Sequence, residues 1–299
     1  TDYDSESYHE LIDRFTHDNE RFLMMEDKRF IFPKGAASGS FLHEMLEHCA
    51  FESVNSSDYR ERYVKDCLNN DYRAVSSKWE IGSISDPNIL MSLQIQNLSA
   101  WLYNICNASL KEAVNSQEPF SLSKLKANHY IPEMEFMLPI RSQQTYGDLN
   151  YLALENARFE KVNTENMRLA PDKEHTRLVG FIKGSIDLVF CHHERFYVVD
   201  YKSNFLGNHP YDYAPKAVRA NVFSPVHRYD MQYLIYSVAL QRFLRLRLGQ
   251  AYSYAKHFGG VIYMYLRGLY ADKNLGMHAT RPNLDIIDKF EHLLCDEEQ

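Results

Sequence analysis

Two neighbouring runs of β-branched and aromatic residues, separated by a short polar segment, constrain the fold of this chain more than any other feature. The first run spans residues 178–190 and the second spans residues 196–202, with the polar segment 192–195 between them. Residues of these types favour β-strands, and a polar break of this length favours a hairpin turn. We therefore predict a β-hairpin whose turn is centred on His193 and Glu194.

This turn position determines which residues face each other across the hairpin. Counting back from the turn, Val189 faces Val198, and Asp187 faces Asp200. Alternation of side chains along a strand places Lys202 on the same face as Asp200. The other face is expected to be apolar and to consist of Ile186, Leu188, Tyr197, Val199 and Tyr201. Apolar residues on both faces are typical of strands inside a sheet.

Two opposed carboxylates on a buried hairpin require a compensating charge. Their Cβ atoms would lie roughly 4.5 to 5.5 Å apart, and burial and like charge both raise the pKa of a carboxyl group. A divalent cation between Asp187 and Asp200 removes both penalties. Mg²⁺ or Mn²⁺ suits such a site, because these ions bind one or two carboxylates together with water and phosphate oxygens. The cation can activate water for attack on a phosphodiester, and the Lys202 ammonium can stabilise the developing charge or help to deprotonate the water.

The same three residues also fit a simpler arrangement, a cross-strand charge cluster at the end of a sheet. An aspartate followed two positions later by a lysine is a short pattern, so Asp200 and Lys202 alone do not decide between the two interpretations. The choice depends on the rest of the chain.

Hydrophobic periodicity predicts further elements before and after the hairpin. A helix that begins at Ser40, with this serine as its N-cap, carries His43. The other expected elements are helices at 59–70, 88–114, 229–248 and 284–294, and strands at 133–140 and 261–266. Residues 141–177 and 203–228 are expected to form loops. This order predicts an α/β fold, with a mixed β-sheet flanked by helices and an added N-terminal helical layer.

Composition narrows the class of protein. The net charge is −7, and 45% of the residues are hydrophobic, as in a globular domain. The five cysteines are scattered without a CxxC pair, so neither a disulfide framework nor a thiolate zinc site is indicated. Because no apolar run is long enough to cross a bilayer and no signal-peptide pattern opens the chain, we expect a cytoplasmic protein without a membrane partner.

The acidic N-terminal residues suggest a boundary near residue 30. Residues 1–30 are interpreted as an acidic linker or N-terminal extension. Residues 31–299 would then form the domain, mainly helical over 31–130 and with the catalytic sheet and its helices over 131–299. The chain contains no GxxxxGK[ST] motif, so it is not itself an ATP-driven motor.

Several short motifs together resemble the PD-(D/E)xK nuclease superfamily. The hairpin contains Gly184-Ser-Ile-Asp-Leu-Val189 and Val198-Val-Asp-Tyr-Lys-Ser-Asn204. The further matching segments are Phe41-Leu-His43, Glu133-Met-Glu-Phe136, residues 200–207, and Gln232 with Tyr236. This combination covers roughly residues 30–270 and resembles more narrowly the nuclease domain of the RecB subunit of bacterial RecBCD helicase-nucleases. Ile186 stands where the superfamily pattern has its nominal proline.

The resemblance implies a restriction-endonuclease-like fold and a set of site residues. The implied metal ligands are His43, Asp187, Asp200 and the backbone carbonyl of Tyr201. The implied catalytic residues are Asp187, Asp200 and Lys202. Gln232 and Tyr236, one helical turn apart, would support the site or contact DNA. An acid of the early strand would join them, and of Glu133 and Glu135, which alternate onto the same face, Glu133 is slightly favoured.

The function that the resemblance implies is that of a metal-dependent deoxyribonuclease domain. It would hydrolyse phosphodiester bonds of single-stranded DNA with Mg²⁺, or with Mn²⁺ as a substitute, by endo- or exonucleolytic cleavage of the exodeoxyribonuclease V type. The implied partners are the helicase portion of the same polypeptide, RecC-like and RecD-like subunits, and a recombinase. The setting would be double-strand break repair and recombination in a bacterium.

Two other functions are weighed against this one. A catalytically silent module that guides DNA or scaffolds such a complex would share the fold, but the intact Asp187, Asp200 and Lys202 argue against it. A zinc metalloprotease would need an HExxH helix. Here Glu47 stands where the second histidine is required, and His48 lies about 140° away from His43 around the helix.

Overall fold

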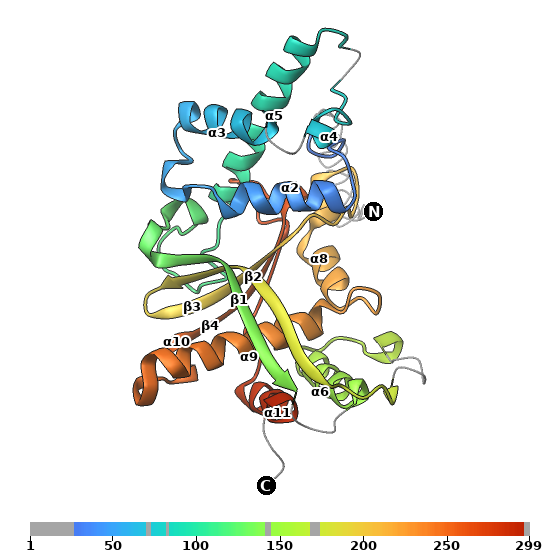
Figure 1. Ribbon diagram of the computed structural model, residues 1–299, viewed down its shortest axis with the longest axis vertical. Helices are drawn as coiled ribbons and strands as arrows, with labels where there is room; N and C mark the ends of the chain where they lie inside the picture. The colour runs from blue at the N-terminus through green and yellow to red at the C-terminus, as the bar shows by residue number, and fades with distance from the viewer. Residues whose placement is uncertain (1–26, 70–72, 82–83, 141–144, 168–173, 296–299) are drawn as a thin grey trace, which may run out of the picture.

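A five-stranded mixed sheet lies at the centre of the fold (Figure 1). In a computed structural model that describes residues 27–69, 73–81, 84–140, 145–167 and 174–295, the strands follow one another across the sheet in chain order. They are β1 (Tyr130–Ile140), β2 (Gly180–His192), β3 (Arg195–Lys202), β4 (Phe258–Tyr265) and β5 (Met277–Thr280). β3 and β4 are parallel, and the other neighbouring pairs are antiparallel. The predicted α/β fold with a mixed sheet is confirmed.

The β2–β3 hairpin has the predicted turn and register. His193 and Glu194 adopt positive φ angles of 49° and 62°, the backbone that a two-residue hairpin turn of type I′ requires. Val189 pairs with Val198, as expected from the position of this turn. α9 (Tyr229–Leu248) then connects β3 to the parallel strand β4, and both of its predicted ends are confirmed.

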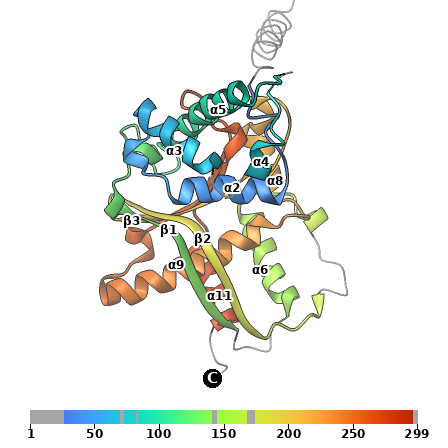
Figure 2. The same ribbon diagram turned by 45° about the horizontal axis from the view of Figure 1, so that its top comes forward.

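Helices cover the two faces of the sheet in separate layers (Figures 1 and 2). One layer packs on Leu188, Phe190 and Val199, and it comes from the N-terminal third of the chain. Its helices are α2 (Ala36–Glu47), α3 (Ser57–Asn69), α4 (Arg73–Ser76) and α5 (Pro87–Asn107). The opposite layer packs around Val189 and Val198. Its helices are α6 (Tyr146–Phe159), α8 (Pro215–Val222), α9 and α11 (Leu284–Cys295), while the short α10 (Tyr254–His257) leads into β4.

The predicted N-terminal helical layer is therefore present. Residues 1–26, most of the segment interpreted as an acidic linker, lie outside the described residues. Within the described ranges, no helix combines the length and the apolar composition needed to span a membrane.

Several boundaries and elements differ from the sequence-based expectations. α2 begins at Ala36 rather than Ser40, because Gly35 with φ 106° supplies the turn that starts the helix. α3 begins two residues early, at Ser57. α5 ends at Asn107 instead of residue 114, since Leu110 donates its backbone N–H to the carbonyl of Phe120 in a loop. β1 and β4 each begin three residues earlier than expected, and the unexpected helices and strands are α4, α6, α8, α10 and β5.

The helix α6 lies inside the segment 141–177, which was expected to be a loop. A capping box begins it: Thr145 accepts from the backbone N–H of Asp148, and the Asp148 carboxylate accepts from the backbone N–H of Thr145 at 2.7 Å. Its buried face, which includes Leu149 and Ala153, packs into the same core as α9 and α11. Residues 141–144 and 168–173 of this segment lie outside the described residues.

A buried arginine fastens the start of the N-terminal layer to the end of β4. Arg267, which is 1% exposed, lies in the short helical turn η7 (Leu266–Gly268) that follows β4. Its guanidinium donates to the backbone carbonyls of Phe32 and Pro33, at 3.1 and 2.8 Å, and to that of Arg29. These carbonyls directly precede α2, so this contact helps to position the helix that carries His43.

We predict that Arg267→Met destabilises the fold by about 3 kcal/mol, because three buried carbonyls lose a charged donor. Urea unfolding measures the change, with Arg62→Met, on the exposed side of α3, as the control that shifts the free energy of unfolding by less than about 0.5 kcal/mol. Equal unfolding midpoints for Arg267→Met and the wild type would show that the arginine does not anchor this segment.

Candidate metal centre

The sheet divides at Asp187. The β2–β3 ladder ends at the pair Leu188 and Val199, after which β2 continues only with β1, and β3 continues with β4. Asp187 is the first residue of β2 beyond this ladder, next to Asp200. Its carboxylate Oδ2 accepts a hydrogen bond from the backbone N–H of Tyr201 at 2.6 Å. The side chain thus replaces the backbone of β2 as the partner of this N–H group.

The alternation of side chains also changes at this point. Pro132 pairs with Leu188, and Met134 pairs with Ile186, so Glu133 lies opposite Asp187 without belonging to the ladder. Glu133 has a φ of 43°, which is uncommon for a residue other than glycine.

The sequence-based assignment of Ile186 to one face of the hairpin is therefore wrong. Ile186 was expected beside Leu188, but it packs in the core that contains Val189 and Val198. Strict alternation between Ile186 and Leu188 fails, and the partner strand changes face at the same place, where Glu133 opposite Asp187 has a left-handed backbone.

Three possible ligands meet where the sheet divides. His43 of α2, Glu133 of β1 and Asp187 of β2 each present a ligand atom, and these atoms lie within 4.8 Å of one another. His43 Nδ1 is 3.3 Å from Asp187 Oδ1. Ser185 donates its hydroxyl to Glu133 Oε2 at 2.5 Å, which orients the glutamate. Asp200 lies beside this group and interacts electrostatically with both His43 and Asp187.

The carboxyl group of Asp200 is in an unfavourable environment for an isolated charge. Asp200 is 2% exposed, and burial raises its pKa to about 6; the Lys202 ammonium opposes this rise, and the Asp187 charge adds to it. Burial lowers the pKa of His43, but its hydrogen bond to Asp187 and the two aspartate charges outweigh burial, so that its pKa is raised. Both groups therefore hold protons more readily than free side chains do.

Lys202 is enclosed by acceptors and aromatic rings. Its Nζ lies 2.5 Å from Asp200 Oδ2 and donates to Gln232 Oε1 at 2.9 Å. The ammonium also lies over the Tyr229 ring, 3.9 Å from its centroid, and 5.1 Å from that of Tyr263. Contacts of this kind stabilise a cation. They hold the lysine head group in one position beside Asp200.

Gln232 is itself held by two tyrosines. Its Nε2 donates to the hydroxyl of Tyr236 at 2.8 Å, and its Oε1 accepts from the hydroxyl of Tyr263 at 3.2 Å. Gln232 and Tyr236, which the resemblance implied as supporting or DNA-contacting residues, thus lie beside Lys202. Tyr229 and Tyr263 were not predicted. Tyr229 could have been found from the sequence, because it lies three residues before Gln232 on the same helix. Tyr263 reaches the site through the β3–β4 pairing, in which it lies opposite Asp200.

The donor set fits a hard divalent cation. One imidazole nitrogen and several carboxylate oxygens are ligands that Mg²⁺ and Mn²⁺ accept. Asp200 Oδ2 is buried and makes no aligned hydrogen bond among the described residues, although it touches the Lys202 ammonium as an ion pair. Such an oxygen, together with the charges of Asp187 and Glu133, leaves negative charge that a cation would neutralise.

Residues that the alternative interpretations required lie elsewhere. Glu135 is exposed and is not part of the His43 group, so of the two candidate acids on β1 only Glu133 reaches the centre. His48 is exposed, lies 3.8 Å from Glu47 and is not part of the group that contains His43. The helix therefore does not form a zincin site.

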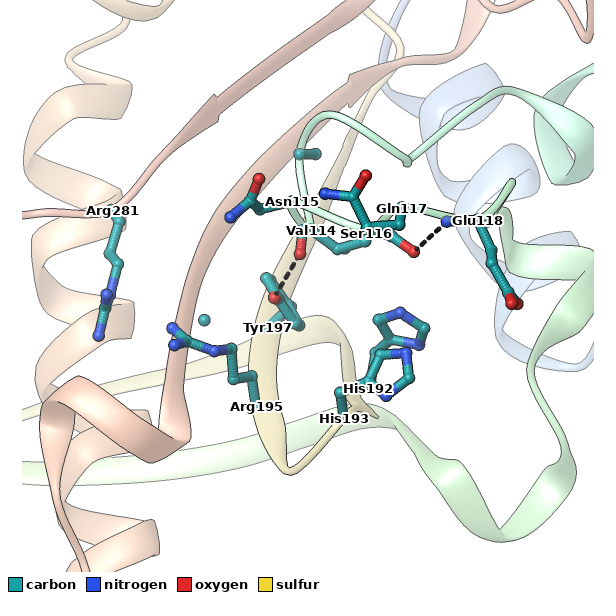
Figure 3. A pocket seen from close by; sticks show the side chains of 12 residues that line it. Val114, Asn115, Ser116, Gln117, Glu118, His192, His193, Arg195, Tyr197 and Arg281 are labelled. Atoms are coloured by element: carbon teal, nitrogen blue, oxygen red, sulfur yellow. Dashed lines mark hydrogen bonds between the residues drawn. The ribbon is translucent and has the colours of Figure 1, made fainter.

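A separate cavity of about 780 Å³ lies at the opposite end of the hairpin, near its turn (Figure 3). Figure 3 shows Arg195 and Arg281 on one side of this cavity and His192 with His193 on another. None of the acids of the candidate centre lines it. This cavity is therefore separate from the candidate metal centre.

Comparison with known proteins identifies relatives of the chain. It is 35% identical to the RecB subunit of the RecBCD enzyme from Escherichia coli K12 over 268 residues, which are 88% of this chain and 19% of that protein. With RecB of Haemophilus influenzae the identity is 29% over 297 residues, 97% of this chain and 20% of that protein. This chain is homologous to the RecB nuclease domain. No protein-family model matches it.

The relationship concerns only part of each RecB subunit. The chain spans about a fifth of the length of these relatives, and the matched part is the C-terminal region of RecB. A match of 94 residues to RecB of Mycobacterium tuberculosis reaches 43% identity, over 31% of this chain. All of these RecB proteins are bacterial.

We predict that the affinity of the chain for Mn²⁺ falls as the pH is lowered through 6. Asp200 must be ionised and His43 neutral to bind a cation, and both pKa values are raised, so protons compete with the metal. Each displaced proton weakens the apparent affinity by about tenfold per pH unit below its pKa. Isothermal titration calorimetry between pH 5 and pH 8 measures this dependence, and an affinity that does not change with pH would contradict the assigned ligands.

A second prediction separates the two glutamates of β1. Glu133→Gln should weaken Mn²⁺ binding about tenfold or more, because it removes one charge from the ligand group. Glu135→Gln, two residues along the same strand, should leave Mn²⁺ affinity unchanged, because Glu135 is exposed outside that group. The reverse order of effects in the same titration would reassign the acid.

Proposed function

We propose that the chain is a Mg²⁺-dependent deoxyribonuclease domain that hydrolyses phosphodiester bonds of DNA. The observation that supports this most is the juxtaposition of the His43, Glu133 and Asp187 group with the buried Asp200–Lys202 pair. Homology to the RecB nuclease region supports the same conclusion from an independent direction. Mn²⁺ is expected to substitute for Mg²⁺.

Each residue has a role in this proposal, taken from the resemblance and supported by contacts where the structure shows them. His43, Asp187, Asp200 and the backbone carbonyl of Tyr201 would hold the cation, with Glu133 as a supporting acid. A bound Mg²⁺ would supply Lewis-acid chemistry, polarising a phosphoryl oxygen and activating water. Lys202 would stabilise charge on the phosphate, since Gln232 and the Tyr229 ring fix its ammonium beside Asp200. Tyr236 would support the site through Gln232, because its hydroxyl accepts a hydrogen bond from the side-chain amide of Gln232.

The larger setting is inferred from the relatives. The chain corresponds to about a fifth of RecB, so we propose that it works as part of a helicase-nuclease with RecC-like and RecD-like subunits, and with a recombinase as a further partner. The substrate would be single-stranded DNA delivered by the helicase portion and cut endo- or exonucleolytically. The domain would act in the bacterial cytoplasm, in double-strand break repair and recombination.

We predict that Asp200→Asn abolishes Mg²⁺-dependent cleavage of circular single-stranded DNA, with a loss of about a thousandfold or more. The side chain keeps its shape but loses the charge on which cation binding depends. Glu194→Gln is the matched control, because it makes the same change in the exposed turn of the same hairpin, and it should cut DNA at the wild-type rate. EDTA should stop cleavage by both the control and the wild type.

Either of two outcomes would contradict the proposal. Full activity of Asp200→Asn would remove the aspartate from the chemistry. A folded wild-type chain that binds Mn²⁺ but cuts neither circular nor linear DNA would favour a catalytically silent, DNA-guiding module.

A further inference from the structure

Beyond the candidate metal centre, β1 and β2 continue as a two-stranded ribbon, and within the part of the chain that the structure describes, helices pack on one of its faces (Figures 1 and 2). The covered face includes Met134, Leu138 and Ile182, which pack into the core formed with α6, α9 and α11. The opposite face consists of three cross-strand pairs, namely Glu135 with Ser185, Met137 with Lys183, and Pro139 with Phe181. We call these six residues the open ribbon face.

The open ribbon face is more apolar than an exposed sheet face usually is. Where one face of an antiparallel sheet is solvated, polar side chains are expected on it. Here Phe181 is 60% exposed and Met137 is 56% exposed. They are diagonal neighbours on adjacent strands, a geometry that places side chains roughly 7 to 8 Å apart. Phe181 and Met137 therefore form a single exposed platform.

A positive charge and a groove accompany this platform. Lys183 is exposed, lies opposite Met137 and has no ion-pair partner among the residues that the structure describes. A groove of about 640 Å³ is lined by Glu135, Met137, Lys183 and Ser185 of this face together with Phe136 and Gly184, so one exposed acid lies in it beside the exposed lysine. An aromatic ring beside an unpaired cation is the combination that binds the bases and phosphates of a single nucleic-acid strand.

The open ribbon face leads directly to the candidate metal centre. Ser185, two residues after Lys183 on β2, donates its hydroxyl to Glu133 of the metal-ligand group. The distance along the strand from Phe181 to Ser185 is roughly 13 Å, given about 3.3 Å per residue. A strand bound on this face would thus have a phosphate within a few nucleotides of the acids.

We propose that the open ribbon face binds a single DNA strand, with a base stacked on Phe181 and Met137 and a phosphate paired with Lys183, and guides it to the metal centre. The inference rests on the proposed function, since it names the surface by which that site takes its substrate. A protein partner is the other class of occupant, but a purely apolar contact would leave the unpaired charge of Lys183 and the continuity with Glu133 without a role.

The experiment measures binding of fluorescein-labelled oligothymidine by anisotropy, with Ca²⁺ in place of Mg²⁺ so that binding is measured apart from cleavage. Phe181→Ala should weaken binding about fivefold or more, since stacking on an aromatic ring contributes strongly for each base. Phe181→Trp should retain it. Phe159→Ala is the matched control, because Phe159 is 63% exposed at the end of α6, outside the open ribbon face, and its loss should change nothing.

A second probe separates stacking from a general loss of structure. An abasic oligonucleotide of the same length should bind wild type and Phe181→Ala equally, because it has no base to stack. Lys183→Ala should weaken binding to both probes and reduce its salt dependence, as removal of a phosphate contact does. Equal binding of oligothymidine by the wild type, Phe181→Ala and Lys183→Ala would overturn the proposal and favour a protein-docking face.

Failure of this proposal and failure of the proposed function give different results. If the wild type cuts DNA with Mg²⁺ but Phe181→Ala binds and cuts equally well, the open ribbon face is not the path of the strand, and the nuclease assignment stands. If oligothymidine binding depends on Phe181 and Lys183 while no variant cuts DNA, the surface binds DNA and the catalytic assignment is wrong.

Discussion

The candidate centre depends on a sheet that stops pairing at one residue. As long as β2 and β3 remain hydrogen-bonded, their backbone groups satisfy each other and no space exists between them for a ligand. At Asp187 the strands separate, and the carboxylate binds the free amide of Tyr201. An aspartate is suited to this position because it can satisfy a backbone donor with one oxygen and present the other to His43. The strands therefore separate at the same residue that brings the acidic side chains together.

The lysine of the centre is positioned by a chain of contacts that begins in the ribbon. Gly184 has no side chain, and a Cβ there would lie 2.7 Å from the Phe136 ring, which occupies that space. Phe136 packs edge-on against Tyr236 at 5.8 Å between centroids. Tyr236 in turn binds Gln232, which accepts from Lys202. Gly184 is therefore needed because it leaves room for the Phe136 ring behind the site. Its φ angle does not itself require glycine.

Much of this arrangement could be predicted from sequence because it is set by short-range patterns. The hairpin register follows from the position of the two-residue turn, and the ends of α9 follow from periodicity. The hairpin register alone places Asp187, Asp200 and Lys202 near one another, whereas the position of Gln232 was implied by the resemblance and not by a local pattern.

Other features depend on contacts that no local pattern encodes. The reversal of faces between Ile186 and Leu188 is matched by the left-handed backbone of Glu133 on a different strand. Tyr263 reaches Gln232 through a parallel pairing that crosses α9. The helix α6 did have a local signal, the capping box at Thr145, but polar composition and neighbouring loops concealed it.

The hydrogen bonds from Arg267 of η7 to the segment before α2 have a consequence for biosynthesis. Arg267 and Arg29 are 238 residues apart in the chain, yet they are bonded in the folded protein. At about 5 to 20 residues per second, a ribosome needs roughly 10 to 50 s to make the intervening chain. During that interval α2 can emerge before Arg267 exists, so the contact that anchors the segment before α2 forms only after residue 267 has been made.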